Sequence, residues 1–544
     1  MPNAKFKVSK PENEPILSYG PGTPERAFLK QRLQELKSQT IEIPLIIGGQ
    51  RVKTGNMAEI RMPHNHEHVL GHYHLAGKNE INMAVEAALE AWQTWSKMPW
   101  EARIAIFKKM AAILQRRNDQ TLNAATMLSQ SKNVMQAEID AACEMIDFLN
   151  FNTWFAQELY EQQPAYSPEG VWNRMEHRAL EGFIFAVTPF NFTSIGGNLP
   201  AAPALMGNTV IWKPASSAVY SAYFMMKLFE DAGLPAGVIN FLPGPGSSLG
   251  PTLLKNPNLG GIHFTGSTAV FQGMWKTIGE NISNYKSYPR IVGETGGKDF
   301  LIAHVSADVD ALSTAMVRGA FEYQGQKCSA LSRAYIPTPI WTELKEKYLA
   351  QVNTIKIGDV EDFSNFMNAV IDKSAYESIK GFIDFAKKSP DSTLLSGGNC
   401  DDSKGYFIEP TTFLTTDPNF KLLCEEIFGP VLTIYIYEPE DWEKTLELVD
   451  STSPYALTGC VFSQDRQAIE EASLKLSHAA GNFYINDKPT GAIVGQQPFG
   501  GSRASGTNDK AGSIFNLIRW VSQRTIKETF DPATDISYPF MSEK

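Results

Sequence analysis

The feature that most constrains the fold is a series of short apolar runs that begins near residue 181. The runs are GFIFAVTPF, NTVIWKP, VINFLPG and GIHFTGS, and helical segments such as SAYFMMKLFEDAGLP separate them. Strands that alternate with helices form a parallel sheet with crossover connections. The sequence therefore predicts an α/β sheet whose ligands bind beyond the carboxyl ends of its strands.

A second series of the same kind begins near residue 298. It contains the strand candidates AYIPTP, VLTIYIY and LTGCVFS and the helix candidate KSAYESIKGFIDFAKKS. Helical spacing also appears earlier, in 79–117, in ERAFLKQRLQELKSQ and in AEIDAACEMIDFLNFNTWFAQEL. Because 544 residues are too many for one compact core, we expect two or three domains.

The stretch IFNLIRWVSQRTIKET, beyond residue 500, alternates apolar and polar residues and is expected to pair as an edge strand. The segment 164–182 is its candidate partner hairpin. Exposed edge strands often mediate contacts between subunits. We therefore expect a homodimer or a higher homo-oligomer.

Charge and cysteine content exclude several classes of protein. The formal net charge is −10, which disfavours binding to nucleic acid or to an anionic membrane. No run of eighteen apolar residues predicts a transmembrane helix, and the amino terminus has no apolar core typical of a secretory signal. The chain has five widely spaced cysteines and no CxxC pair, so we expect no metal site, no disulfide framework and a reducing compartment.

The strongest local motif is FEYQGQKCSALSR around Cys328. The cysteine lies between a Gly-Gln-Lys turn and small polar residues, and the adjacent Lys327 is expected to favour the thiolate. Taken alone, the motif also fits a buried structural cysteine.

Two further motifs carry polar groups suited to catalysis. IVGETGGKD places Glu294 in what we expect to be an irregular turn, where partial burial would raise the pKa of a general base. FAVTPFNF places Asn191 after a strand, where its amide could stabilise an oxyanion. Alone, each also fits an ordinary turn residue.

Three motifs bear on a nucleotide. In IHFTGS, Gly266 and Ser267 open a helix whose amides could meet a pyrophosphate. In CEEIFGPV, Glu426 could accept hydrogen bonds from a ribose and Phe428 could pack on a ring. The stretch GPGSSLG (244–250) lacks the usual dinucleotide spacing and receives little weight.

Together and in this order, the motifs TPFNF, IWKP, FTGS, GETGGK, GQKCS and EEIFGPV resemble the aldehyde dehydrogenase superfamily over about residues 45–540. The runs EGFIFAVTPFNFTSIGGNLPAAPALMGN, QAEIDAACEMIDFLNFN and AGNFYINDKPTGAIVGQQPFGGSRASGTNDKAG resemble its pyrroline-5-carboxylate dehydrogenase branch.

The resemblance implies a role for each matching residue. Cys328 would be the nucleophile, Asn191 would hold the oxyanion with the Cys328 N–H, and Glu294 would activate the water that hydrolyses a thioester. NAD, with NADP not excluded, would be held by residues at the strand ends and in the EEIFGPV segment, namely Thr188, Phe190, Lys213, Gly266, Ser267, Glu426 and Phe428.

The implied substrate is glutamate γ-semialdehyde, formed by ring opening of pyrroline-5-carboxylate and oxidised to glutamate in proline catabolism. Backbone N–H groups of Gly491 and Ala492 would bind its α-carboxylate, helped by Ser329. Phe192 and Phe499 would pack on its aliphatic chain, and Glu144 would place a carboxylate near the pocket. Ordinary loop packing remains the alternative for each of these residues.

The implied fold is a Rossmann-type NAD-binding domain, an α/β catalytic domain and a small β flap for oligomerisation. We place the amino-terminal arm at 1–44, the NAD-binding domain at 45–163 and 183–297, and the catalytic domain at 298–500. The oligomerisation hairpin and the carboxyl-terminal tail take 164–182 and 501–544.

Three positions depart from the usual superfamily pattern. Ser216 replaces a glutamate that favours NAD, Phe271 replaces a glycine in the cofactor site, and Pro200 replaces a lysine. The first departure leaves the preference between NAD and NADP open.

Three alternatives also stay open: a dehydrogenase for another semialdehyde such as succinate semialdehyde, a catalytically silent structural relative, and a module of a bifunctional proline-oxidising enzyme. The polar amino terminus and the carboxyl-terminal strand favour a stand-alone chain over the module. The compartment is expected to be the cytoplasm in a bacterium or the mitochondrial matrix in a eukaryote.

Overall fold

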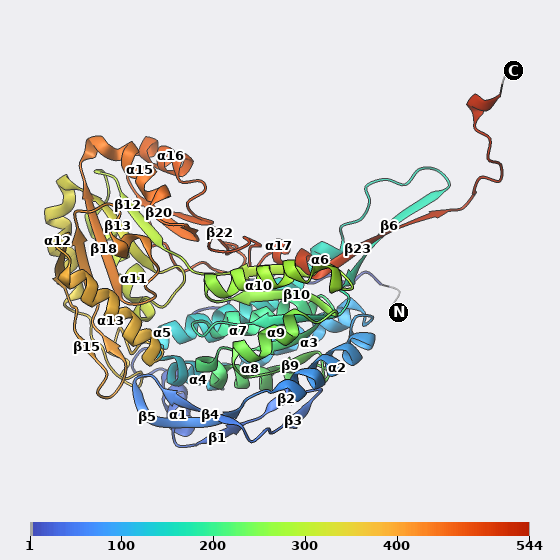
Figure 1. The fold of residues 1–544 in the computed structure, drawn as a ribbon, viewed down its shortest axis with the longest axis horizontal. Coiled ribbons are helices and arrows are strands. Elements are labelled where there is room, and N and C mark those ends of the chain that lie inside the picture. Colours follow the sequence, from blue (N-terminus) through green and yellow to red (C-terminus); the bar gives the residue numbers. More distant parts are fainter. Residues whose placement is uncertain (1–3, 543–544) are drawn as a thin grey trace.

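The computed structural model describes residues 4–542. Two seven-stranded sheets, each flanked by helices, form the body, and a two-stranded ribbon projects from it (Figure 1). The expected α/β class is confirmed. No helix in residues 4–542 combines the length and the apolar character needed to cross a membrane.

The first sheet has the order β11-β10-β7-β8-β9-β2-β3. Strands β7 to β11 run parallel, and β2 joins β9 in antiparallel orientation. The strands are β2 (Leu45–Ile47), β3 (Gln50–Val52), β7 (Phe183–Val187), β8 (Thr209–Lys213), β9 (Ile239–Phe241), β10 (Leu259–Thr265) and β11 (Arg290–Glu294). The four strands predicted from the apolar runs are β7, β8, β9 and β10.

Successive residues of β7 face two different cores. Ile184 and Ala186 pack in one hydrophobic cluster, whereas Phe183 and Phe185 pack in another. A parallel sheet buried on both faces requires such continuous apolar strands. The connecting helices are α7 (Thr193–Leu205), α8 (Val219–Asp231), α9 (Gly246–Leu254) and α10 (Thr268–Glu280).

The second sheet has the order β14-β17-β18-β13-β12-β20-β21, and only β14 is antiparallel to its neighbour. Its strands are β12 (Asp299–Ala303), β13 (Leu331–Pro337), β14 (Ser392–Ser396), β17 (Thr411–Thr415), β18 (Val431–Tyr437), β20 (Thr458–Phe462) and β21 (Asn482–Ile485). Its main helices are α11 (Val309–Phe321), α12 (Thr338–Val352), α13 (Lys373–Lys388), α15 (Trp442–Ser451) and α16 (Arg466–Lys475).

Within residues 4–542, six α-helices precede the parallel strands of the first sheet. They are α1 (Pro24–Lys37), α2 (Lys78–Trp95), α3 (Trp100–Leu114), α4 (Thr121–Gln130), α5 (Val134–Ala137) and α6 (Met145–Tyr160). Helices α1, α2, α3 and α6 lie where the sequence predicts helical spacing, whereas α4 and α5 were not predicted. Pro99, which lacks a backbone N–H, immediately precedes α3 and separates it from α2. Between α5 and α6 the chain forms a π-helix, Glu138–Glu144, which the sequence did not predict.

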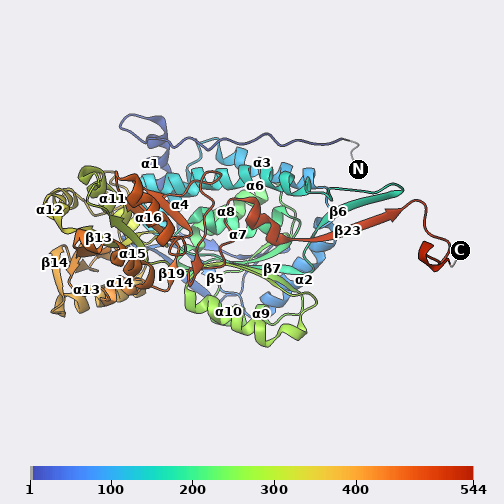
Figure 2. The same cartoon turned by 90° about the horizontal axis from the view of Figure 1, so that it is seen from above.

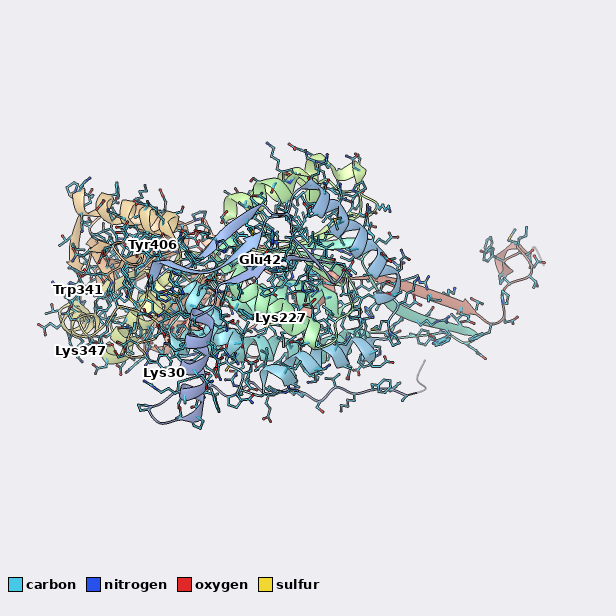
Figure 3. All side chains as sticks on the ribbon, turned by 90° about the horizontal axis from the view of Figure 1, so that it is seen from below. Lys30, Glu42, Lys227, Trp341, Lys347 and Tyr406 are labelled. Atoms are coloured by element: carbon cyan, nitrogen blue, oxygen red, sulfur yellow. The ribbon has the colours of Figure 1, made fainter. Side chains whose placement is uncertain are left out.

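The sequence also missed a small sheet of order β1-β5-β4, formed by β1 (Ile41–Ile43), β4 (Met57–Met62) and β5 (Asn65–His74). This sheet reaches the second α/β unit. The Tyr406 N–H donates to the Pro63 carbonyl at 3.0 Å, and the Tyr406 ring lies 5.1 Å from the ring of His66 (Tyr406 is labelled in Figure 3). The amino-terminal region is therefore joined to both halves of the body.

The projecting ribbon consists of β6 (Val171–Ala179) and β23 (Val521–Thr529), paired antiparallel along their full length. The pairing of these segments is confirmed, but the expected strand does not begin at residue 514. Residues 514–520 form α17 (Ile514–Leu517) and a 3₁₀ turn, because Leu517 and Trp520 insert into the core.

Candidate active site

A left-handed turn carries the candidate nucleophile. After α11 ends, Tyr323, Gln324 and Gly325 have φ angles of 51°, 55° and 65°. A side chain at Gly325 would overlap the Gly429 carbonyl, so this position requires glycine. The turn leads directly to Cys328, which is buried.

Three amide side chains fix this turn. Gln324 Nε2 donates to the carbonyls of Ser131 and Ala369 at 2.9 and 2.8 Å, and Gln326 Oε1 accepts from the Ile371 N–H at 2.9 Å. Asn191 Nδ2 donates to the Gln326 carbonyl at 3.1 Å. The predicted oxyanion donor thus lies against the turn that carries Cys328.

Cys328 lines two cavities and lies where they meet. The first, of about 590 Å³, is lined by Glu294 and by all six predicted substrate residues: Glu144, Phe192, Ser329, Gly491, Ala492 and Phe499. The second, of about 870 Å³, is lined by Asn191 and by all seven predicted cofactor residues: Thr188, Phe190, Lys213, Gly266, Ser267, Glu426 and Phe428. The structure therefore brings every predicted site residue to one of two adjoining spaces.

The electrostatics of Cys328 differ from the expectation. Burial, with further contributions from the carboxylates of Glu294, Asp299 and Glu426, raises the pKa of its thiol well above the usual value. Lys327, expected to favour the thiolate, instead places its ammonium 2.9 Å from Glu322. Its charge is already paired, so the prediction that Lys327 activates the thiol is wrong.

Glu294 lies on the wall of the first cavity. It is the last residue of β11 rather than part of an irregular turn, and the irregular segment follows it. Burial raises the pKa of its carboxyl to about 8, Lys510 opposes the rise, and Asp509 and Glu144 add to it. A carboxyl of this pKa exchanges protons near neutrality, as a general base requires.

The wall of the first cavity also offers donors and a second carboxyl. Ser329 Oγ and Thr490 Oγ1 are 2.7 Å apart, which joins the nucleophile's turn to the 490–492 loop. Gly491 has a φ of 102°, a conformation that glycine adopts without strain. Glu144 accepts a hydrogen bond from Ser194 Oγ at 2.8 Å, and burial raises its pKa to about 8.

The second cavity has the features of a dinucleotide site. At the start of α10, Ser267 Oγ accepts from the Val270 N–H at 3.4 Å. A side chain at Gly266 would overlap the Phe264 ring, so the backbone there stays open to a ligand. Burial lowers the pKa of Lys213 to about 8. An anion at the helix start would suit both groups.

Aromatic and acidic groups line the second cavity together with Cys328. Phe190 and Phe428 meet edge to face with centroids 5.7 Å apart. Glu426 accepts from the Gly297 N–H at 2.9 Å, and burial raises its pKa. The residues present therefore fit a ribose and a ring next to the thiol.

The structure places the three residues that depart from the usual superfamily pattern. Ser216 is exposed in a 3₁₀ turn just beyond the cavity. Phe271 stacks on Phe264 at 5.3 Å and fills the space over Gly293, where a side chain would overlap its ring. Pro200 is buried inside α7.

Some site residues escaped the sequence analysis. Gly246, Ser247 and Gly250 of the GPGSSLG stretch line the second cavity from α9, although their spacing is not that of the usual motif. Thr490 and Ile16 line the first cavity. Glycine enrichment was a usable signal for the first group, whereas no sequence pattern marks Ile16.

Comparisons with known proteins agree with this arrangement. A family model described as "Aldehyde dehydrogenase family" matches residues 51–526. The chain is 52% identical to the mitochondrial delta-1-pyrroline-5-carboxylate dehydrogenase of Dictyostelium discoideum, covering 99% of this chain and 97% of that one. The human protein of the same name is 47% identical, over 98% of this chain and 94% of that one.

A crystal structure described as the delta-pyrroline-5-carboxylate dehydrogenase of Mycobacterium tuberculosis bound with NAD superimposes with a TM-score of 0.96. Its identity to this chain is 50%, over 99% of this chain and all of that one.

Proposed function

Because this chain belongs to the aldehyde dehydrogenase family, we propose that it oxidises L-glutamate γ-semialdehyde, the open form of pyrroline-5-carboxylate, to L-glutamate with NAD. This is a reaction of proline catabolism. The observation that carries the proposal is that Cys328 lines both the cavity that contains Glu294, Glu144 and Ser329 and the cavity at the start of α10.

In the first step, Cys328 Sγ attacks the aldehyde carbon and forms a thiohemiacetal. The proton of the thiol passes to the carboxylate of Glu294, which lines the same cavity, and from there to solvent. Asn191 Nδ2 and the Cys328 N–H stabilise the oxyanion, and one such donor contributes about 10²–10³ in rate.

NAD bound in the second cavity would accept the hydride released from the thiohemiacetal carbon, and this loss leaves a thioester on Cys328. Thr188, Gly266 and Ser267 would hold it beside the start of α10. Lys213 would bind the adenosine ribose, and Glu426 would bind the nicotinamide ribose, with Phe190 and Phe428 packed around the site. Fixing the ring next to Cys328 orients the reacting atoms.

In the last step, Glu294 takes a proton from a water molecule, which attacks the thioester carbonyl. Glutamate leaves and the Cys328 sulfur is restored to the thiol. The pKa of about 8 suits a base that must release its proton again after each turnover.

Substrate choice comes from the other end of the cavity. The Gly491 and Ala492 amides, with Ser329, bind the α-carboxylate. Phe192 and Phe499 pack on the methylene chain, and Glu144 faces the substrate amine. This set of donors favours an amino acid aldehyde over an unsubstituted one.

The remaining assignments concern regions and assembly. We assign 45–163 and 183–297 to dinucleotide binding, 298–500 to catalysis, and 164–182 with 501–544 to contact between copies of the chain. We also propose a homo-oligomer built through the ribbon.

We place the protein in a reducing compartment, either a bacterial cytosol or a mitochondrial matrix. All five cysteines of the chain are free thiols, and reduced thiols persist in such compartments. Fractionation of the source cells tests this placement.

The test of function is NADH formation with pyrroline-5-carboxylate, run beside succinate semialdehyde and beside NADP. We expect a kcat/KM at least about tenfold higher for pyrroline-5-carboxylate, because leaving the carboxylate donors unpaired is costly. Equal use of succinate semialdehyde would remove the substrate assignment, and absence of turnover with every aldehyde would remove the proposed activity.

A further inference from the structure

The amino-terminal arm, residues 4–23, runs as an extended chain beside α3 and α6 (Figure 2). Its backbone is bonded to buried side chains of the body. The Val8 N–H donates to Gln157 Oε1, the Glu14 N–H donates to Asp147 Oδ1 at 2.8 Å, and the Leu17 N–H donates to Glu138 Oε1 at 3.0 Å. The arm therefore follows a fixed path.

This path leads to the substrate cavity. Ile16 lines the same cavity as Cys328. Three residues before it, Asn13 makes three hydrogen bonds through its side-chain amide. Nδ2 donates to Asp147 Oδ2 and to the Val494 carbonyl, each at 2.8 Å, and Oδ1 accepts from Gln496 Nε2 at 2.8 Å. One amide thus links the arm, α6 and the loop that follows Thr490.

The loop 491–497 depends on this link. Within residues 4–542, its hydrogen bonds to other parts of the chain are those of Asn13; its remaining bonds are internal, between Ile493 and the pair Gln496 and Gln497. Its apolar anchor is Val494, which packs with Phe148 and Phe151. A loop with two positive-φ glycines and one apolar anchor has considerable freedom without a polar tether.

We propose that the amino-terminal arm is part of the substrate site, and that Asn13 is a positioning residue that holds the 491–497 loop where its amides meet the substrate carboxylate. This inference rests on the proposed function, because it assumes a carboxylate-bearing aldehyde. Asn13 acts through the loop and leaves the chemistry at Cys328 untouched. Its loss therefore weakens recognition of the carboxylate while an aldehyde that lacks one reacts as before.

The experiment compares Asn13→Ala with the unmodified enzyme on pyrroline-5-carboxylate and on butanal, which has no carboxylate. We expect kcat/KM for pyrroline-5-carboxylate to fall about tenfold, mostly through a higher KM, as loss of one to two net hydrogen bonds predicts. The value for butanal should change by less than about twofold.

Three controls accompany this variant. Glu12→Ala changes the adjacent, exposed residue, which takes no part in these bonds, and should behave like the unmodified enzyme. Gln496→Ala removes one bond from the exposed loop side without disturbing the core, so it tests the same link if Asn13→Ala folds poorly. The double variant Asn13→Ala with Gln496→Ala should lose no more kcat/KM for pyrroline-5-carboxylate than the two single variants lose together. Thermal unfolding and NAD binding verify that each variant is folded.

Equal losses on both aldehydes would mean that Asn13 supports the fold in general, and unchanged kinetics on both would mean that the loop needs no tether; either result overturns the inference. Failure of the proposed function appears earlier and separately, as an unmodified enzyme that does not prefer pyrroline-5-carboxylate to butanal.

Discussion

At Cys328, the burial that shapes the site also opposes ionisation of the nucleophile. The carboxylates of Glu294, Asp299 and Glu426 act in the same direction, and the ammonium of the adjacent Lys327 is paired with Glu322. Burial and the nearby carboxylates both favour the protonated thiol over the thiolate. We therefore expect the reactivity of Cys328 to depend on proton removal during attack.

Replacement of the nucleophile should separate chemistry from binding. We expect Cys328→Ala to abolish NADH formation while NAD still binds within about twofold of the unmodified affinity, because the dinucleotide contacts lie in the second cavity. Steady-state assays and fluorescence titration measure the two effects. Cys400→Ala, at a partly buried cysteine of the 400–401 strand, is the matched control and should retain activity. Turnover by Cys328→Ala would remove the nucleophile assignment.

The pH dependence should report Glu294. Its carboxyl has a raised pKa of about 8, and only the deprotonated form can accept the proton of water. Thioester hydrolysis should therefore slow about tenfold per pH unit below 8 and level off above it. Glu294→Gln should remove this dependence and show a burst of NADH followed by slow turnover in stopped-flow experiments. A normal steady rate without a burst would contradict the role.

At the scale of single residues, the sequence singled out the candidate reactive groups but did not predict their electrostatics. Each of the motifs around Cys328, Glu294 and Asn191 lies within one short stretch of the chain, so it could be recognised from the sequence alone. The ion pair of Lys327 with Glu322 depends on the left-handed turn between these two residues. No periodicity in the sequence predicts that turn.

Among the elements, the π-helix Glu138–Glu144 has the widest effect on the site. Its Asp140 accepts from the Thr193 and Ser194 N–H groups at 2.9 and 2.8 Å, at the start of α7, and pairs with the buried Lys132 at 2.7 Å. Lys132 also lies 4.1 Å from the centroid of the Phe192 ring. One buried ion pair thus fixes the segment that carries Asn191 and Phe192.

Breaking this pair should destabilise the protein strongly. Asp140→Ala leaves the Lys132 ammonium buried without its partner, which typically costs about 3–5 kcal/mol of unfolding free energy. Chemical denaturation measures the change. Asp441→Ala, in an exposed pair with Lys444, is the control and should leave stability unaltered. Similar stabilities for the two variants would show that Lys132 is not held by Asp140.

Strands β7 to β10, β13, β18 and β20 were predictable because they are mostly buried and therefore almost continuously apolar, whereas β11, β12, β17 and β21 were not predicted. The α17 segment was expected to be a strand. Its buried residues Leu517 and Trp520 are three positions apart, a spacing that also fits a short helix. The β1-β5-β4 sheet was missed because β5, NHEHVLGHYH, mixes polar and apolar residues on half-buried faces. The π-helix has no sequence period of its own in so short a stretch.

In the whole molecule, the ribbon of β6 and β23 is a part that packs little against other elements. An isolated two-stranded sheet is marginally stable in water, and this one extends away from the body with open edges (Figures 1 and 2). Trp172 on β6 is 51% exposed. A second copy of the chain that covers the ribbon would account for both features.

The assembly should therefore depend on the ribbon. We expect the variant Trp172→Ser with Ile526→Glu to shift the mass measured by light scattering from an oligomer to a monomer. Leu474→Ser changes a residue that is 77% exposed on α16, far from the ribbon, and should leave the mass unaltered. A monomeric unmodified protein, or an oligomer that survives both ribbon changes, would contradict the assignment.

The placement of Cys328 at the meeting point of two cavities also affects how ligands bind and leave. The aldehyde and the dinucleotide would reach the sulfur through two different cavities, so neither molecule would occupy the route of the other. Steric obstruction therefore imposes no order of arrival, and the acid can depart while the reduced dinucleotide is still in place. Any strict kinetic sequence in this enzyme must come from a change of shape on binding.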